Sequence, residues 1–234
     1  FITDLTYESY LEFYHTYYHP SNSYIYLYGN MDMEEKLAFL DEHYLSHFDY
    51  LDVDSVIQEQ KAFGACRDVT LEYPVAENEG EEDNTYLSYN MVVGNAADSQ
   101  MAMAFEVLDY ALLSAPGAPL KQALLDVKAG KDVYGSYDDG ILQPYFTVIA
   151  KGSNPDRKEE FVSVIRQVLG DIVKNGIDRK AVEAGINYFE FRYREADFSS
   201  YPKGLMYSLD ILGDWLYEKG NPFAQVQQLS LIHI

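Results

Sequence analysis

The sequence predicts an α+β fold, with a mainly antiparallel sheet and helices packed on one of its faces. Of the 234 residues, 47% are apolar and 15% aromatic, which supplies a packed core and excludes a disordered chain. From residue 85 onward the expected order is strand, two helices, two strands and three helices. The two consecutive strands are joined by a tight turn at Asp139-Gly140 and therefore pair antiparallel. Hairpin strands beside blocks of helix are typical of the α+β layer architecture.

Residues 1–50 predict a helix, a strand and a second helix. In residues 5–18 tyrosines and a leucine recur at helical spacing, and in 24–28 tyrosines alternate with aliphatic residues as in a strand. Asp32 then caps the second helix. A single strand leaves both of its hydrogen-bonding edges unpaired, so this unit is too small to stand alone.

Residues 51–84 predict an acidic linker between two domains. The stretch at 76–83 has five acids in eight residues, whereas residues 65–74 favour a short strand. The single cysteine, Cys66, has no partner for an internal disulfide and is interpreted as a structural or idle thiol. A reducing compartment, either the cytoplasm or an organelle matrix, suits this usage.

Residues 85–234 predict a second domain, which we expect to be cut short at its C-terminal end. Pro144 falls inside a predicted strand and therefore indicates an edge strand or a bulge. The expected strands are 85–94, 132–139 and 141–152; the expected helices are 98–113, 119–130, 155–176, one beginning at 178, and 205–217.

The net charge of -21 excludes nucleic acid as a partner, because phosphates would be repelled. No apolar run reaches the roughly 18 residues that a membrane-spanning helix needs. A basic partner would be attracted, although general solubility explains the same charge. The 22 tyrosines suit either recognition or packing, and their spacing favours packing. A carbohydrate-binding module would instead expose coplanar rings.

Two histidine pairs have the spacing of zinc ligands on a helix. His15 and His19, and likewise His43 and His47, lie four residues apart, but neither pair encloses the glutamate that would activate water. The stretch FLDEH approaches the inverted zinc motif H-x-x-E-H, with Phe39 at the first histidine position. Surface or packing histidines are the better interpretation, so the residues themselves predict neither a metal ligand nor a catalytic group here.

Three stretches together resemble the pitrilysin/insulinase family of zinc metallopeptidases, most closely its presequence protease branch. They cover nearly all of the chain in the expected order, and YYHPSN and YLYGNMD are long enough to be specific. The stretches are LTYESYLEFYHTYYHPSNSYIYLYGNMD, TYLSYNMVVG and LLSAPGAPLKQALLDVKAGKDVYGSYDDG.

The resemblance implies that this chain is a fragment of a larger enzyme. Family members have homologous αβ roll domains in two halves that enclose a chamber, where short unstructured peptides are degraded. Residues 1–50 would end the first, catalytic-type domain, and 85–234 would be most of a non-catalytic second domain of the same type. The family's zinc ligands, an H-x-x-E-H helix and a downstream glutamate, would precede Phe1. No zinc ligand or catalytic residue is therefore transferred to this chain.

The implied partners are peptide substrates, with basic ones favoured by charge, and the missing N-terminal and C-terminal parts of the same protein. The alternative is a scaffold or assembly protein on the same fold, with its zinc site lost. The terminal LSLIHI departs from the family pattern and suggests truncation or a foreign tail, so His233 is given no role.

One weaker transfer concerns substrate binding. In related enzymes a sheet edge docks the substrate by strand addition, and the matching positions here are Gly117 in SAPGAP and Gly135 in VYGSY. Glycine permits close approach of another backbone, and main-chain pairing needs no particular side chain. The alternative is that Gly117 belongs to an ordinary connection between helices and Gly135 is an ordinary strand glycine.

Overall fold

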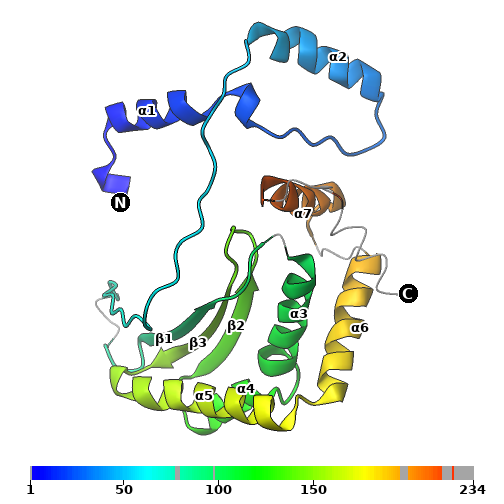
Figure 1. Cartoon of the computed structure of the whole chain (residues 1–234). Coiled ribbons are helices and arrows are strands. Elements are labelled where there is room, and N and C mark those ends of the chain that lie inside the picture. Colours follow the sequence, from blue (N-terminus) through cyan, green and yellow to red (C-terminus); the bar gives the residue numbers. More distant parts are fainter. Residues whose placement is uncertain (1, 77–79, 97, 196–199, 218–222, 224–234) are drawn as a thin grey trace.

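The computed structural model describes residues 2–76, 80–96, 98–195, 200–217 and 223, and its elements follow the predicted order after residue 85 (Figure 1). The helices are α1 (Tyr7–Tyr17), α2 (Met33–His43), α3 (Ser99–Asp109), α4 (Pro119–Asp126), α5 (Lys158–Asn175), α6 (Arg179–Glu195) and α7 (Lys203–Tyr217). The strands are β1 (Thr85–Val92), β2 (Asp132–Asp138) and β3 (Tyr145–Ser153). Short helical turns are η1 (Ile2–Asp4), η2 (Pro20–Asn22), η3 (Leu45–His47), η4 (Tyr110–Ser114) and η5 (Pro155–Arg157).

The strands form one antiparallel sheet in the order β1-β3-β2, so β3 is central and both other strands are edges. The edge or bulge expected at Pro144 is therefore wrong. Pro144 lies fully buried just before β3, where its missing N–H costs no ladder bond, and its carbonyl accepts the Val93 N–H at 2.8 Å. The irregularity in the sheet occurs at the opposite end of β3, where the register shifts between Thr85 and Leu87.

The core lies between one face of the sheet and the helices. Strand residues alternate between faces, so Phe146, Val148 and Ala150 of β3 all point inward and are almost fully buried. The core cluster comprises Leu87, Leu112, Leu113, Leu120, Leu124, Ala129, Val133, Phe146, Val148, Ala150, Phe161 and Ile165. This arrangement confirms the α+β prediction, with helices packed on one sheet face.

The other face of the sheet carries a polar network at its centre. Thr147 Oγ1 donates to Asn90 Oδ1 at 2.6 Å, and Ser88 Oγ lies 3.4 Å from Thr147 Oγ1. Thr147 is only 4% exposed, and the hydrogen bond to Asn90 satisfies its buried hydroxyl.

Local sequence explains where the helices begin and end. Asp98 caps α3 by accepting the Met101 N–H at 3.0 Å, and Asp32 caps α2 by accepting the Glu35 N–H at 3.1 Å. Gly176 ends α5 with φ +88°, a conformation that favours glycine. The helix predicted to run to Leu113 instead changes at Tyr110 into a π-helical turn, closed by the Ala115 N–H bonded to the Tyr110 carbonyl at 2.7 Å.

The strand predicted at 24–28 is absent: these residues are extended, and no backbone–backbone hydrogen bond joins them to another described residue. A strand needs a partner, and none of the described segments pairs with this one. Instead its side chains contact α7, with the Tyr24 and Trp215 rings 4.6 Å apart and the Tyr28 and Tyr207 rings 6.0 Å apart. Helix α7 thus lies between the N-terminal unit and the sheet (Figure 1).

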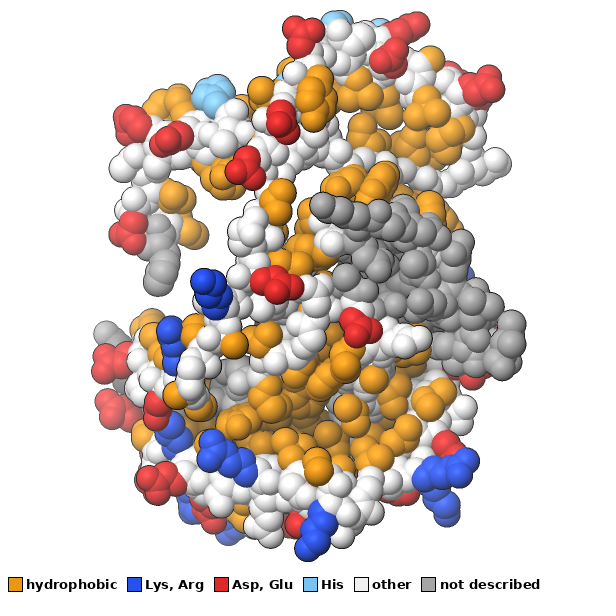
Figure 2. Space-filling model, in the orientation of Figure 1, with side chains coloured by type: hydrophobic (Ala, Val, Ile, Leu, Met, Phe, Trp, Pro, Cys, Tyr) orange, Lys and Arg blue, Asp and Glu red, His pale blue; other side chains and the backbone are white. Residues whose placement is uncertain are grey.

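The N-terminal unit has no core of its own. Of the described residues of α1 and α2, none is buried, and Phe13 and Phe39 are 57% and 58% exposed. Figure 2 shows hydrophobic side chains gathered on the surface of this unit. The sequence periodicity correctly predicted two amphipathic helices, but their apolar sides are left uncovered by the described chain.

The linker crosses to the sheet without regular structure, and the strand expected at 65–74 does not form. Polar contacts hold it: the Gln60 N–H donates to Gln143 Oε1 at 2.6 Å, the Gln143 side-chain amide returns a bond to the Gln60 carbonyl, and Asp68 pairs with Lys158. Part of the predicted acidic stretch, residues 77–79, lies outside the described residues, as does the LSLIHI segment. Among the helices that the structure describes, none combines the length and apolar character needed to cross a bilayer.

Candidate functional site

Gly135 lies on the edge strand β2, but its Cα faces the helices. A Cβ added there would lie 2.2 Å from Leu113 Cδ1, 2.7 Å from the Thr147 carbonyl oxygen and 3.1 Å from Asp109 Oδ1. The absence of a side chain at Gly135 therefore allows η4 to approach the sheet closely. Any contact that Gly135 makes with a docked peptide must use its main chain.

Gly117 lies in the exposed turn that joins η4 to α4. Its φ of +73° is a left-handed conformation that favours glycine, and a Cβ built there would meet nothing within 4 Å. The turn is closed by the Ala118 N–H bonded to the Ala115 carbonyl at 3.0 Å. The two predicted glycines thus occupy different environments, since one is exposed and the other is covered by Leu113.

The edge of β2 that faces away from β3 pairs with no strand among the described residues. An unpaired edge presents free N–H and C=O groups along its length, which is the surface that an extended peptide uses for strand addition. Strand β1 is the other edge of the same sheet. Neither edge therefore pairs with a further strand in the part of the chain that the structure describes.

Asp109 is a half-buried carboxylate between α3 and β2 that was not predicted from the sequence. Its Oδ2 accepts the Ser114 hydroxyl at 3.3 Å, while its buried Oδ1 has no hydrogen-bond partner among the described residues. Burial raises the pKa of Asp109, and the Ser114 hydrogen bond partly opposes this. The sequence could have indicated this burial, because Asp109 lies four residues from both Phe105 and Leu113 and thus on the apolar side of the predicted helix.

A second group of acids surrounds the tip of the β2–β3 hairpin. Burial, followed by the nearby charges of Asp139, Glu106 and Asp98, raises the pKa of Tyr137 to about 12. Burial also raises the pKa of Asp139 and of Asp210 on α7, and the charge of Asp139 adds to the shift at Asp210. The charge of Asp139 therefore disfavours the ionised form of Asp210 where α7 meets the hairpin.

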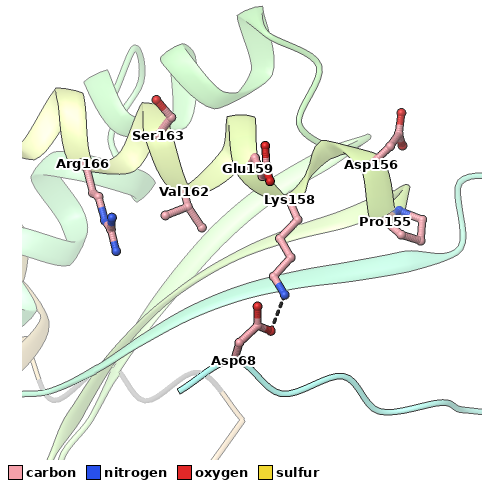
Figure 3. Close-up of a pocket in the computed structure, with 8 residues that line it drawn as sticks. All are labelled: Asp68, Pro155, Asp156, Lys158, Glu159, Val162, Ser163 and Arg166. Carbon is pink, nitrogen blue, oxygen red and sulfur yellow. Dashed lines mark hydrogen bonds and ion pairs between the residues drawn. The ribbon is translucent and has the colours of Figure 1, made fainter. Parts of the chain in front are cut away.

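A cavity of about 650 Å³ lies along α5, beside the linker (Figure 3). Lys158, Val162 and Arg166 project from α5 toward the side where the linker residue Asp68 lies. Three carboxylates and two cations line the cavity, so charge of neither sign is concentrated there. The lining residues include no histidine or cysteine, so this cavity offers groups for binding rather than a nucleophile with its base.

The histidine pairs do not share helix faces. Helix α1 ends at Tyr17, so His19 lies beyond it, where its Nδ1 accepts the Ser21 N–H at 3.2 Å. Helix α2 ends at His43, and His47 belongs to the following turn. The i,i+4 premise fails because both helices end inside the motif. In the described part of the chain, no three His, Cys, Asp or Glu side chains are grouped so as to hold a metal ion.

Comparison with known proteins identifies a family match over most of the chain. A family model described as "Peptidase M16 inactive domain" matches residues 4–189. Protein HypA of Clostridium perfringens is 45% identical over 226 residues, which cover 97% of this chain and 23% of that protein. Presequence protease 1 of Arabidopsis thaliana, chloroplastic/mitochondrial, is 32% identical over 230 residues, which cover 97% of this chain and 21% of that protein. The chain therefore spans less than a quarter of the length of these relatives.

Two solved structures share the fold. A putative M16-like peptidase from Alicyclobacillus acidocaldarius superposes with a TM-score of 0.59 at 18% identity, over 100% of this chain and 53% of that one. A protease from Helicobacter pylori gives a TM-score of 0.56 at 16% identity, over 98% of this chain and 57% of that one.

Proposed function

Since this chain belongs to the peptidase M16 family, the pitrilysin/insulinase family of zinc peptidases, we propose that it is a non-catalytic part of a zinc metalloendopeptidase. The whole protein would degrade short unstructured peptides in a closed chamber, and this part would shape the chamber wall and dock substrate. The observation that carries the proposal is the match of residues 4–189 to the inactive domain of the family.

Zinc is proposed for the full-length protein alone. The described residues of this chain do not fit a zinc site, because they bring no three suitable ligands together. The ligands and the glutamate that activates water would come from the part of the protein that precedes this one. No step of peptide hydrolysis is therefore assigned to a residue of this chain.

The proposed domain division places the end of the catalytic-type domain at residues 1–50, the linker at 51–84 and the inactive domain at 85–234. Two features support this division. Helices α1 and α2 have no buried residue among those described, and the extended segment at 24–28 makes no backbone–backbone hydrogen bond to another described residue. Both features suit a fragment whose packing partners, the missing N-terminal and C-terminal parts of the protein, lie elsewhere in the same molecule.

Substrate docking is proposed at the free edge of β2, where Gly135 would contribute its main chain and Gly117 would border the bound peptide. The chain's net charge of -21 favours peptides of opposite sign, such as basic targeting sequences, by long-range attraction. Presequence protease 1 of Arabidopsis thaliana is a chloroplastic/mitochondrial protein by name, and a reducing organelle matrix or the cytoplasm suits the single cysteine here.

A scaffold on the same fold is the second candidate function, and the described residues, which hold no metal-binding group, fit it as well as they fit the peptidase proposal. The coding sequence upstream of Phe1 discriminates between the two. An H-x-x-E-H motif with a distal glutamate is expected for the peptidase, and its absence would favour the scaffold.

Hydrogen exchange of the full-length protein tests the docking role. A basic unstructured peptide should slow amide exchange in β2, Asp132–Asp138, while peptide cleavage should stop when a chelator removes the metal. Protection confined to β1, Thr85–Val92, would overturn the assignment of the β2 edge. Cleavage that is insensitive to chelation would overturn the metalloendopeptidase proposal.

A further inference from the structure

A second cavity, of about 360 Å³, lies at one end of the sheet, where β1 and β2 begin and β3 ends. Tyr86, Lys151 and Asp132 belong to the sheet face that points away from the helices, according to the strand register. The lining residues are Asp83, Asn84, Tyr86, Lys131, Asp132, Lys151 and Gly152. The cavity therefore opens at the end of the uncovered sheet face.

The backbone around this cavity departs from regular geometry at several adjacent points. The register shift between Thr85 and Leu87 leaves Lys151 and Gly152 opposite Tyr86, and Gly152 has φ +67°. Asp83 also has a left-handed φ, of +59°. Bulges and such conformations re-aim side chains and are frequent beside functional sites. The irregular backbone at this end of the sheet therefore makes the cavity a candidate binding site.

Most of the charged side chains in the cavity have fixed partners. Lys131 Nζ lies 3.3 Å from Asp83 Oδ2, and Asp132 Oδ1 lies 3.4 Å from Lys121 Nζ. Asn154 donates to Asp83 Oδ1 at 2.7 Å, and this hydrogen bond and Lys131 lower the pKa of Asp83. The Asp83 carboxylate is thus held ionised as part of the wall, and it neutralises Lys131.

Lys151 is different. Among the described residues it pairs with no carboxylate, and its Nζ lies 5.8 Å from the centre of the Tyr86 ring. That distance is within the range of a cation–π contact, which keeps the ammonium near an aromatic wall without consuming its hydrogen bonds. The Tyr86 ring itself is positioned by an edge contact with Tyr73 at 5.9 Å. The cavity therefore presents one ammonium without a carboxylate partner in the described part of the chain, beside an exposed ring.

We propose that this cavity binds the C-terminal carboxylate of a peptide, with the Lys151 ammonium pairing with the carboxylate and the last side chain lying against the Tyr86 ring. The proposal rests on the proposed peptide-docking function and adds a recognised group to it. A carboxylate is the natural partner of an unpaired ammonium, and a charge-assisted bond is stronger than a neutral one. The volume is at the lower end for ligand sites and suits the end of a chain.

The strong negative charge of the chain restricts which carboxylates will be bound. A free anion is repelled at long range, whereas a basic peptide is attracted as a whole while its terminus reaches Lys151. An acidic side chain inside a peptide carries the same chemical group as the terminus. The test must therefore separate a terminal carboxylate from an internal one and from a small free acid.

The experiment measures binding of fluorescent basic peptides to the full-length protein, made cleavage-incompetent by metal removal. Three peptides share one basic sequence: a free C-terminal acid, its C-terminal amide, and an amide with one internal glutamate. An N-acetylated phenylalanine serves as the small free acid. The variants are Lys151→Gln and, as the matched control, Lys180→Gln on α6, which removes the same charge from a lysine without an ion pair among the described residues.

The expected result is that the acid binds up to about fivefold more tightly than either amide, the upper end of the range for one partly exposed charge pair. Lys151→Gln should abolish this ratio, and Lys180→Gln should preserve it. Equal affinities of acid and amide, or a ratio unchanged in Lys151→Gln, would overturn the carboxylate site while leaving peptide docking intact. If the internal-glutamate amide or the small acid bound more tightly than the peptide with the free C-terminal acid, the assignment to a terminal carboxylate would be overturned. Failure of every peptide to bind would refute the proposed docking function itself.

Discussion

Replacing Gly135 with alanine tests whether the sheet and η4 are packed as closely as the structure indicates. The new methyl carbon would lie 2.2 Å from Leu113 Cδ1 and 2.7 Å from the Thr147 carbonyl oxygen. Leu113 is 2% exposed and belongs to the core cluster, and Thr147 is part of the central strand. Neither neighbour can retreat without moving other buried groups.

The expected loss follows from these contacts. Overpacking a well-packed core costs about 1–3 kcal/mol of stability. Because one clash is with a backbone oxygen of the central strand, we expect Gly135→Ala to cost about 3 kcal/mol. For a chain of this size, about 1 kcal/mol corresponds to a shift of roughly 2–4 °C in Tm. The variant should therefore melt roughly 6–12 °C below the wild type.

Thermal unfolding followed by circular dichroism measures this shift, with Gly170→Ala as the matched control. Gly170 is exposed in α5 and a Cβ there meets nothing within 4 Å, so the same substitution should stabilise by about 0.5–1 kcal/mol through helix propensity. In a Leu113→Ala background the cost of Gly135→Ala should shrink, because one of the two clashes is gone. A Gly135→Ala variant that melts within about 1 °C of the wild type would refute the close packing.

Three further substitutions have defined outcomes. Asp109→Asn should stabilise the protein, and urea unfolding at several pH values should show this gain growing as pH rises from about 4 to 7. The reason is that burial raises the folded-state pKa of Asp109. The wild-type protein therefore has its full stability below the unfolded-state pKa of about 3.9 and loses stability as pH rises through the folded-state pKa. A difference from wild type that does not change with pH would contradict this. Asp210→Asn should act in the same direction, because burial and then Asp139 raise the pKa of Asp210; a smaller stability gain at pH 7 than at pH 4 would count against it. Gly204→Ala should displace the Tyr28 ring, 2.3 Å from the added Cβ, weakening that contact by about 1–2 kcal/mol and speeding proteolysis within residues 23–28. The matched control is Gly213→Ala on the same helix, where an added Cβ meets nothing within 4 Å; this variant should be cleaved at the wild-type rate.

The regular elements of the second unit were predictable because their signals are local. Asp98 before α3, Pro119 at the first position of α4 and Gly176 after α5 mark helix ends through backbone groups only a few residues away. These features require no knowledge of distant contacts. The antiparallel pairing of β2 with β3 was also predicted, but the tight turn at Asp139-Gly140 was wrong: Asp138 pairs with Tyr145, so the connection is the longer loop 139–144.

The failures concern elements whose state depends on a distant partner. Residues 24–28 alternate as a strand does, yet they remain extended without ladder bonds because no described segment pairs with them. Pro144 was predicted to mark an edge strand or a bulge. It instead precedes the central strand, and which strand is central depends on sheet order, which no local pattern reveals. The histidine pairs, interpreted from the sequence as surface or packing residues, do not share a helix face because each helix ends before the second histidine of its pair.

The candidate sites divide in the same way. Gly135 could be singled out from the sequence by resemblance, but that Leu113 fills the space beside it could not. The unusual position of Asp109 was visible in the sequence, because the residue falls on the apolar side of its helix. The cavity at Lys151 was not visible there, since its walls come from three strand ends far apart in the chain.

The sequence by itself determined the fold class, the family and the net charge, because these depend on composition, ordered motifs and local backbone preferences. The tertiary structure decided which strands are the edges of the sheet, which glycine is covered, and which lysine lacks a carboxylate partner among the described residues. Strand order and side-chain pairing arise from contacts between distant residues, and the free energy of such contacts has no counterpart in a local sequence pattern.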